Sequence, residues 1–214
     1  MYRIFHGKHR IILSSNEGLK EKFQPDFIFK KPNEEQIKEA LRVSKKATKS
    51  LTILVVGNPD KLLKKVFVEF KYVAAAGGIV ENKKGKVLLM KRLGKWDLPK
   101  GKAKKNEDIE ACALREIEEE TGASGLSILS SFEDTYHTYF RNNTWQIKHT
   151  CWYLISCTKD GSLIPQTEED IEEVRWVKGK HISTSLIDTY PAIQYLLNKY
   201  KKYKKAEKKA NWTL

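Results

Sequence analysis

The sequence predicts an α+β protein built from two successive α+β parts. Short apolar runs of strand length alternate along the chain with stretches that carry helix caps and helix-spaced apolar residues. The pattern changes near Lys71, where longer strand-like runs begin. A chain of 214 residues has room for a small domain followed by a medium one. We therefore expect a small N-terminal domain over residues 1–71 and a larger domain over residues 72–200.

The N-terminal part is expected to form a small α+β domain of unknown role. Its expected elements are a hairpin of Tyr2–Phe5 and Arg10–Leu13, a helix from Pro32 to Lys46, a strand at Leu51–Val56, and a short helix that Asn58 caps ahead of Pro59. His6 and His9 lie at the hairpin turn without a neighbouring Cys or carboxylate. We expect them to be ordinary surface histidines.

The second part alternates strands with two helices. Its expected elements are strands at Tyr72–Val80 and Val87–Lys91, a loop at Leu93–Asn106, a helix at Glu107–Thr121 ended by Gly122, long strands at Ser127–Tyr139 and Gln146–Cys157, a strand at Val174–Val177, and a final helix capped by Ser183 or Thr184. That helix is expected to run into a Lys-rich C-terminal tail, residues 201–214.

Composition excludes several classes of protein. No stretch approaches the ~18–20 unbroken apolar residues of a membrane-spanning helix, and the N-terminus lacks the apolar core of a signal peptide. Cys112, Cys151 and Cys157 are too few and too scattered for a disulfide framework or a Cys-based zinc site. We therefore expect an intracellular, cytoplasmic protein that does not contact membranes.

The net charge of +13 favours polyanionic partners. The segment Lys199–Lys209 alone holds seven Lys and one Glu. The plainer interpretation is a solvated, basic helix end. The alternative is a weak, non-specific contact with nucleic acid.

The helix expected at Glu107–Thr121 carries the chemistry. On a helical wheel Glu116 and Glu120 fall within the arc of Ile109, Ala113 and Ile117, which must pack on the sheet. A carboxylate on a buried face is costly unless it is paired or binds a metal ion. Glu119 joins the other two within one turn, and a hard divalent cation with oxygen ligands would relieve their repulsion. The alternative is an acidic, exposed helix end.

The preceding loop supplies positive charge. Pro99 and Gly101 shape a tight turn in WDLPKGK whose backbone can approach a ligand and offer a carbonyl oxygen to a metal ion. Lysines line this loop at positions Lys100, Lys102, Lys104 and Lys105. A basic loop, an acidic helix and a cation together fit the cleavage of a pyrophosphate by water.

The segment Gly101–Ala123, GKAKKNEDIEACALREIEEETGA, resembles the Nudix box, G-x5-E-x7-R-E-U-x-E-E-x-G-U, in which U is a bulky aliphatic residue. The matching positions are Gly101, Glu107, Arg115, Glu116, Ile117, Glu119, Glu120 and Gly122. Ala123 is small for the last aliphatic position.

The resemblance implies an α/β/α sandwich around a mixed sheet, Mg²⁺ or Mn²⁺ as cofactor, and hydrolysis of a nucleoside diphosphate linked to another moiety. Carried over by position, the metal ligands are Glu116, Glu119 and Glu120, with the carbonyl of Lys100 or Gly101. Arg115 orients a glutamate, and Glu107 braces the junction of loop and helix. For the general base, Glu119 or Glu116 comes first, and Glu168 or Glu169 second.

The substrate is less closely defined. WDLPKGK resembles the Nudix branch that acts on diadenosine polyphosphates and diphosphoinositol polyphosphates. The expected substrate contacts are Arg92, Lys100, Lys102, Tyr139 and Lys148. A small nucleotide or polyphosphate is therefore the expected partner, and a homodimer stays open. Two alternatives remain: a nucleotide-sensing, Nudix-like transcriptional regulator that binds DNA, and an RNA 5′-end pyrophosphohydrolase.

Overall fold

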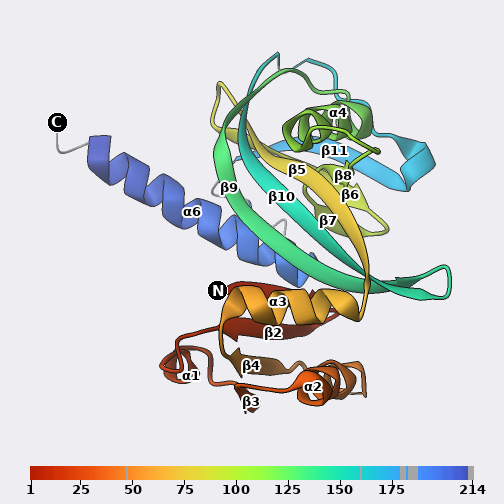
Figure 1. Ribbon diagram of the computed structural model, residues 1–214. Helices are drawn as coiled ribbons and strands as arrows, with labels where there is room; N and C mark the ends of the chain where they lie inside the picture. Colours follow the sequence, from red (N-terminus) through yellow and green to blue (C-terminus); the bar gives the residue numbers. More distant parts are fainter. Residues whose placement is uncertain (47, 160, 179–181, 183–187, 212–214) are drawn as a thin grey trace. The chain divides into compact units, whose positions relative to one another are not determined.

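The computed structural model describes every residue except 47, 160, 179–181, 183–187 and 212–214 (Figure 1). The expected caps Ser183 and Thr184 lie outside the described residues. The chain divides into two compact units. The first unit comprises Met1–Ala74 and Thr135–His149, and the second comprises Ala75–Asp134 and Thr150–Leu214. The division expected from the sequence, with limits at residues 71 and 200, stays a prediction.

The first unit is a sheet covered on one face by helices. Its elements are β1 (Tyr2–His6), β2 (His9–Ser14), α1 (Leu19–Phe23), β3 (Phe27–Lys30), α2 (Glu34–Lys46), β4 (Thr52–Val56) and α3 (Pro59–Val68). The strand order is β9-β1-β2-β4-β3, where β9 contributes its end from Thr135 onward. The β1–β2 pair is antiparallel, whereas β2–β4, β3–β4 and β1–β9 are parallel.

Amphipathic helices fix the core of this unit. Asn58 caps α3 by accepting a hydrogen bond from the backbone N–H of Lys61, and Pro59 occupies the first turn, as expected from the sequence. Ile37 and Leu41 of α2 join Leu62 of α3 in a buried cluster against the sheet. Helices α2 and α3 therefore cover one face of the sheet.

The prediction of surface histidines is wrong. His6 and His9 are both buried, at 5% exposure each. The ring of His6 bonds to the Thr138 hydroxyl and lies 5.1 Å from the ring of Trp145. His9 Nδ1 accepts a hydrogen bond of 3.1 Å from the Leu51 N–H. These partners are distant in sequence, so local composition could not reveal the burial.

The second unit is an α/β/α sandwich, in agreement with the predicted fold class (Figure 1). Its elements are β5 (Lys71–Asn82), β6 (Lys86–Arg92), β7 (Lys95–Asp97), β8 (Lys100–Lys102), α4 (Ile109–Thr121), β9 (Ser124–Arg141), β10 (Thr144–Lys159), η1 (Thr167–Glu169), β11 (Ile171–Lys178) and α6 (Pro191–Asn211). The strand order is β11-β6-β5-β10-β9, with β7 paired to β6 and β8 paired to β5. Strands β5, β9 and β10 extend from one unit into the other.

Alternation along the strands creates the two apolar faces. Successive side chains of a strand point to opposite faces of the sheet. Val80 and Tyr153 accordingly pack with Ile117 of α4. Their neighbours Ile79 and Leu154 pack on the other face with residues of α6. The helix that carries the box glutamates therefore occupies one face of the sheet.

Near the candidate site, the loop and the start of the helix both differ from the sequence-based expectation. The segment Leu93–Asn106, expected to be a loop, contains the strands β7 and β8, which are too short to show an alternating pattern. Helix α4 begins at Ile109 because the Asp108 carboxylate accepts the backbone N–H groups of Glu110 and Ala111. Among the described residues, no helix is both long and apolar enough to cross a membrane.

Candidate active site

Strand β8 brings the basic loop against helix α4. Gly101 pairs with Ala76 of β5, which holds the loop backbone at the sheet. A Cβ placed on Gly101 would overlap the carboxylate of Glu116. Any other residue at this position would displace that carboxylate, so the close approach explains the glycine.

Glu120 is the most buried acidic side chain of the helix, with 0% exposure. Its Oε2 accepts a hydrogen bond of 2.7 Å from the Lys100 N–H. Within the described part of the chain, its Oε1 is buried without a hydrogen-bond partner. Burial raises the pKa of Glu120 to about 7 because the charged form loses its hydration.

Glu116 and Glu119 share one arginine. Arg115 Nη1 donates to Glu116 Oε1 at 2.7 Å and to Glu119 Oε2 at 2.8 Å. Glu116 is buried, and this burial raises its pKa. Glu119 is exposed and also lies 3.7 Å from Lys104 Nζ. The guanidinium group of Arg115 therefore holds a buried and an exposed carboxylate side by side.

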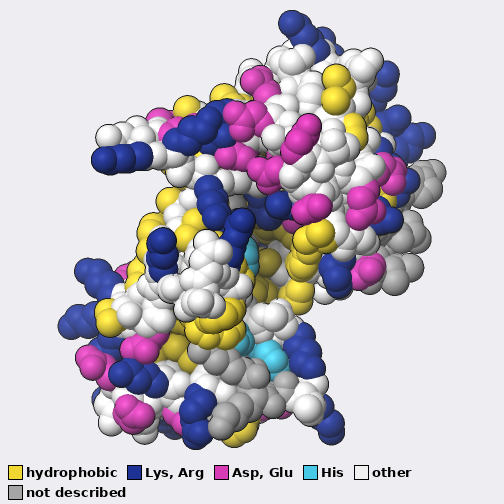
Figure 2. Space-filling model, turned by 90° about the vertical axis from the view of Figure 1, so that its right-hand side faces the viewer, with side chains coloured by type: hydrophobic (Ala, Val, Ile, Leu, Met, Phe, Trp, Pro, Cys, Tyr) yellow, Lys and Arg dark blue, Asp and Glu magenta, His cyan; other side chains and the backbone are white. Residues whose placement is uncertain are grey.

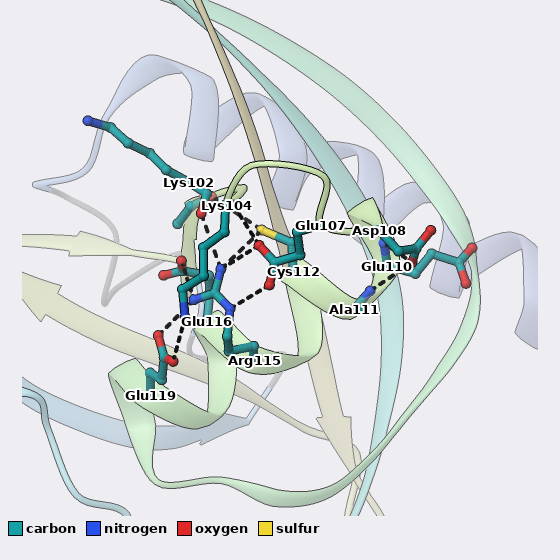
Figure 3. A network of polar contacts seen from close by, with 11 residues as sticks. Lys102, Lys104, Glu107, Asp108, Glu110, Ala111, Cys112, Arg115, Glu116 and Glu119 are labelled. Carbon is teal, nitrogen blue, oxygen red and sulfur yellow. Dashed lines mark hydrogen bonds and ion pairs between the residues drawn. The ribbon is translucent and has the colours of Figure 1, made fainter.

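Arg115 is the centre of this polar network (Figure 3). Its Nε and Nη2 donate to the two carboxylate oxygens of Glu107 at 2.6 and 2.8 Å. Glu107 also accepts the N–H of Lys104 at 2.7 Å, and the pKa of Glu107 falls to about 2, chiefly through its bond to Arg115. Arg115 Nη2 further donates to the Lys102 carbonyl at 3.2 Å, so the network ties loop to helix.

A second acidic segment reaches the same helix. Glu169 of η1 lies 3.3 Å from Arg92 Nη2, and its charge contributes to the raised pKa of Glu116. Two backbone bonds, from Ile164 N–H to Thr121 O and from Gln166 N–H to Glu120 O, fasten this segment to the end of α4. Of the two loop acids considered from the sequence, Glu169 is thus the one with an observed link to the site.

The expected substrate lysines have different surroundings. Lys100 Nζ lies 2.6 Å from the buried carboxylate of Asp97, an ion pair that the sequence analysis missed although both residues stand in WDLPKGK. Lys102 is exposed. A phosphate contact by either lysine stays a prediction.

Tyr139 and Lys148 belong to the first unit, whereas Arg92, Lys100 and Lys102 belong to the second. Lys148 Nζ lies 5.8 Å from the centre of the Tyr139 ring. The Tyr139 hydroxyl donates to Gln146 Oε1 at 2.9 Å. The structure therefore brings Tyr139 and Lys148 close to each other within the first unit.

The donor set fits a hard divalent cation. Carboxylate oxygens at three positions of one helix face, together with a nearby backbone carbonyl, are the ligand types that Mg²⁺ and Mn²⁺ prefer. The orphaned Oε1 of Glu120 is the strongest indication, because a buried charged oxygen without a partner is costly. A bound cation would supply that partner.

The fold and the site define a class: an α/β/α sandwich in which a glycine-containing loop meets a helix lined with glutamates. The chain belongs to the Nudix family. The family model, described as NUDIX domain, matches residues 71–196. Nudix hydrolases generally need divalent metal ions, usually Mg²⁺.

Curated relatives share about a third of the aligned residues. The mRNA-decapping protein g5R of African swine fever virus (isolate Pig/Kenya/KEN-50/1950) is 32% identical over 127 residues, which cover 51% of this chain and 50% of that protein. The mRNA-decapping enzyme subunit 2 of Arabidopsis thaliana is 32% identical over 87 residues, covering 41% of this chain and 22% of that protein. The RNA pyrophosphohydrolase of a Wolbachia species is 32% identical over 85 residues, which cover 38% of this chain and 51% of that protein. The chain thus spans about half of these relatives or less.

Solved structures of Nudix proteins also align with the chain. A C. elegans Ap4A hydrolase binary complex aligns with a TM-score of 0.48 and 20% identity, covering 63% of this chain and 98% of that chain. The MutT protein of Methanosarcina mazei aligns with a TM-score of 0.46 and 21% identity, and the alignment covers 65% of this chain and 98% of that chain.

Proposed function

We propose that this protein is a Mg²⁺- or Mn²⁺-dependent pyrophosphohydrolase that cleaves a phosphoanhydride bond in a nucleoside diphosphate linked to another moiety. The observation that carries the proposal is Glu120. It is a fully buried carboxylate whose Oε1 has no hydrogen-bond partner among the described residues. Burial of a carboxylate oxygen without a partner is costly, and a bound cation would supply the missing partner.

The residues proposed to hold the cation are Glu116, Glu119 and Glu120, with the backbone carbonyl of Gly101. When bound, the ion would supply positive charge to the polyphosphate and lower the pKa of an attacking water. Close packing of Gly101 against Glu116 supports this assignment because it leaves no room for a side chain between loop and helix.

The chain's own groups position the reaction. Arg115 holds the carboxylates of Glu116 and Glu119 side by side through hydrogen bonds of 2.7 and 2.8 Å. In the proposed reaction water attacks a phosphorus atom, the bridging P–O bond breaks, and a carboxylate accepts the proton of the water. The first candidates for that base are Glu119 and Glu116, and the second is Glu169, which Arg92 holds at the end of the helix.

For the substrate, we favour the 5′ end of RNA. Among the curated relatives, the viral and plant proteins are named for mRNA decapping, and the Wolbachia protein is named as an RNA pyrophosphohydrolase. The net charge of +13 suits a long polyanion. Figure 2 shows Lys and Arg side chains scattered over the visible face, with Asp and Glu side chains grouped in its upper part and others at its lower left.

A free dinucleoside polyphosphate is the second candidate, favoured by the WDLPKGK loop. An RNA cap and a dinucleoside polyphosphate contain the same kind of bond, a phosphoanhydride in a bridge between two 5′ carbons. The two candidates therefore share one chemistry, and they differ in whether an RNA chain continues beyond the bridge.

A hydrolysis panel separates them. The purified full chain would be incubated with Mg²⁺ or Mn²⁺ and with capped RNA, 5′-triphosphate RNA, a capped dinucleotide, diadenosine tetraphosphate, nucleoside triphosphates and an inositol pyrophosphate. Ion-exchange chromatography would quantify the products. We expect the highest kcat/KM on an RNA end. Preference for the free dinucleotide would select the second candidate, and hydrolysis of none would refute the proposed function.

A further inference from the structure

One sheet region of the first unit combines aromatic and basic side chains and contains no acidic residue. The two segments that pair there, residues 1–16 and 135–149, hold no Asp or Glu. They contain five Lys or Arg residues: Arg3, Lys8, Arg10, Arg141 and Lys148. Such a region repels cations and basic proteins and attracts a polyanion.

The strand register sorts these residues onto two faces. On β1 and β9, Ile4 pairs with Tyr136, and Phe5 pairs with His137. Ile4 and Tyr136 belong to the buried cluster that contains residues of α2 and α3. Neighbours along a strand point to opposite faces, so Phe5, His137 and Tyr139 face away from those helices.

The face opposite α2 and α3 carries a compact aromatic and basic group. The rings of His137 and Tyr139 lie 5.4 Å apart at 33°. Lys148 Nζ of β10 lies 5.8 Å from the Tyr139 ring centre. Each of these three residues is half-buried, so part of each reaches solvent. Arg10 of β2 pairs with Phe5 and therefore stands on the same face.

We propose that this group, His137, Tyr139 and Lys148 with Arg10 nearby, is a binding platform for single-stranded RNA. Stacking of a base on an aromatic side chain beside lysines and arginines that meet the phosphates is how single strands are bound without strong sequence preference. A sheet with helices on one face can present such rings on the other. Phe5, Ile12 and Leu54 of this face are buried, which limits the platform to β9, β10 and the exposed Arg10.

The inference deepens the proposed function, because the body of an RNA whose 5′ end is hydrolysed needs a second contact. It is tested independently of hydrolysis. Fluorescence anisotropy would follow the binding of a labelled, single-stranded RNA of about 12 nucleotides with a 5′-hydroxyl, which contains no phosphoanhydride. The full-length protein would be used in EDTA, with single-stranded DNA and duplex RNA as comparison probes.

The variants are chosen as matched pairs. Tyr139→Ala should raise the Kd about tenfold, whereas Tyr139→Phe, which keeps the ring, should stay within about twofold. Lys148→Ala should weaken binding. It should also reduce the slope of log Kd against log salt concentration by the amount expected for about one lost phosphate contact. Tyr190 offers a control, since it is an exposed tyrosine of the second unit with Lys95 Nζ 5.7 Å from its ring centre. Tyr190→Ala and Lys95→Ala should leave the affinity unchanged.

Several outcomes would overturn the platform. The first is an RNA affinity equal to that of the wild type in a folded Tyr139→Ala protein. An equal loss in Tyr139→Phe is another, because it would assign the effect to the bond between the hydroxyl and Gln146. If Tyr139→Ala does not fold, an unchanged affinity and salt slope in Lys148→Ala refute the proposal. Platform-dependent binding without hydrolysis of any RNA end would reject the RNA 5′ end as the substrate and retain the platform.

Discussion

The carboxylate of Glu116 occupies the space that a Cβ on residue 101 would fill, so Gly101 and Glu116 are in direct steric contact. The loop and the helix of the candidate site are therefore packed against each other at Gly101 and Glu116, with no space for a Cβ between them. The atoms in question are the far end of a flexible side chain, which can move. A substitution at residue 101 should consequently displace the carboxylate and leave the backbone of the fold largely intact.

Gly101→Ala is expected to lower kcat/KM by about 100-fold, because a displacement of about 1 Å in a positioned group can cost that much. The melting temperature should change little. Steady-state kinetics and thermal unfolding measure the two effects. Gly161→Ala is the matched control, since among the described residues no atom beyond its chain neighbours lies within 4 Å of the added Cβ. Full activity of Gly101→Ala would show that Glu116 does not need its observed position.

Glu120→Gln is expected to keep or raise the melting temperature without added metal. Burial raises the pKa of Glu120 to about 7, so the ionised carboxylate is costly in the fold, and an amide of the same shape avoids that cost. The rise in melting temperature on adding Mg²⁺ should be lost in this variant. Glu118→Gln, an exposed neighbour on the same helix, should respond to Mg²⁺ as the wild type does.

Arg115→Lys is expected to lower turnover by roughly 10- to 100-fold and to destabilise the fold by about 1–3 kcal/mol. A lysine ammonium cannot reproduce the paired bonds to Glu107 while also reaching Glu116 and Glu119. Urea unfolding and kinetics would be measured on the same preparation. Wild-type values in both assays would mean that the network does not position the carboxylates.

A chain truncated before Lys201 is expected to keep most of its activity on free dinucleoside polyphosphates. The truncation retains buried Tyr200, whose hydroxyl donates to Glu81, and removes the ion pair of 3.3 Å between Lys204 and Glu81. Non-specific RNA binding should weaken and lose part of its salt dependence between about 50 and 200 mM salt. Loss of small-molecule hydrolysis in a folded truncated protein would place the tail in the site.

The sequence predicted the helix and its buried glutamates because both follow from local periodicity. Glu116 and Glu120 share an arc with Ala113 and Ile117, and all four are buried. The cap of α3 was predictable for a similar reason, because Asn58 bonds to Lys61, only three residues further along the chain.

Contacts between distant segments were not predictable in this way. Arg92 meets Glu169, and His6 is covered by Thr138 and Trp145, across many intervening residues. The short strands β7 and β8 also escaped prediction, because three residues are too few to show an alternation. Grouping of the hairpin end Thr135–His149 with the N-terminal residues depends on the pairing of β1 with β9, which no local pattern encodes.

The most direct test of a cation-dependent glutamate site is the rate of phosphoanhydride hydrolysis, measured with and without Mg²⁺ in wild type and in Glu119→Gln, Glu120→Gln and Glu118→Gln. Capped RNA and a capped dinucleotide would serve as substrates. We expect EDTA to abolish hydrolysis and Mg²⁺ or Mn²⁺ to restore it. Glu119→Gln and Glu120→Gln should lose about two orders of magnitude or more, whereas exposed Glu118→Gln should match the wild type. Hydrolysis that persists in EDTA, or in both Glu119→Gln and Glu120→Gln, would contradict the account.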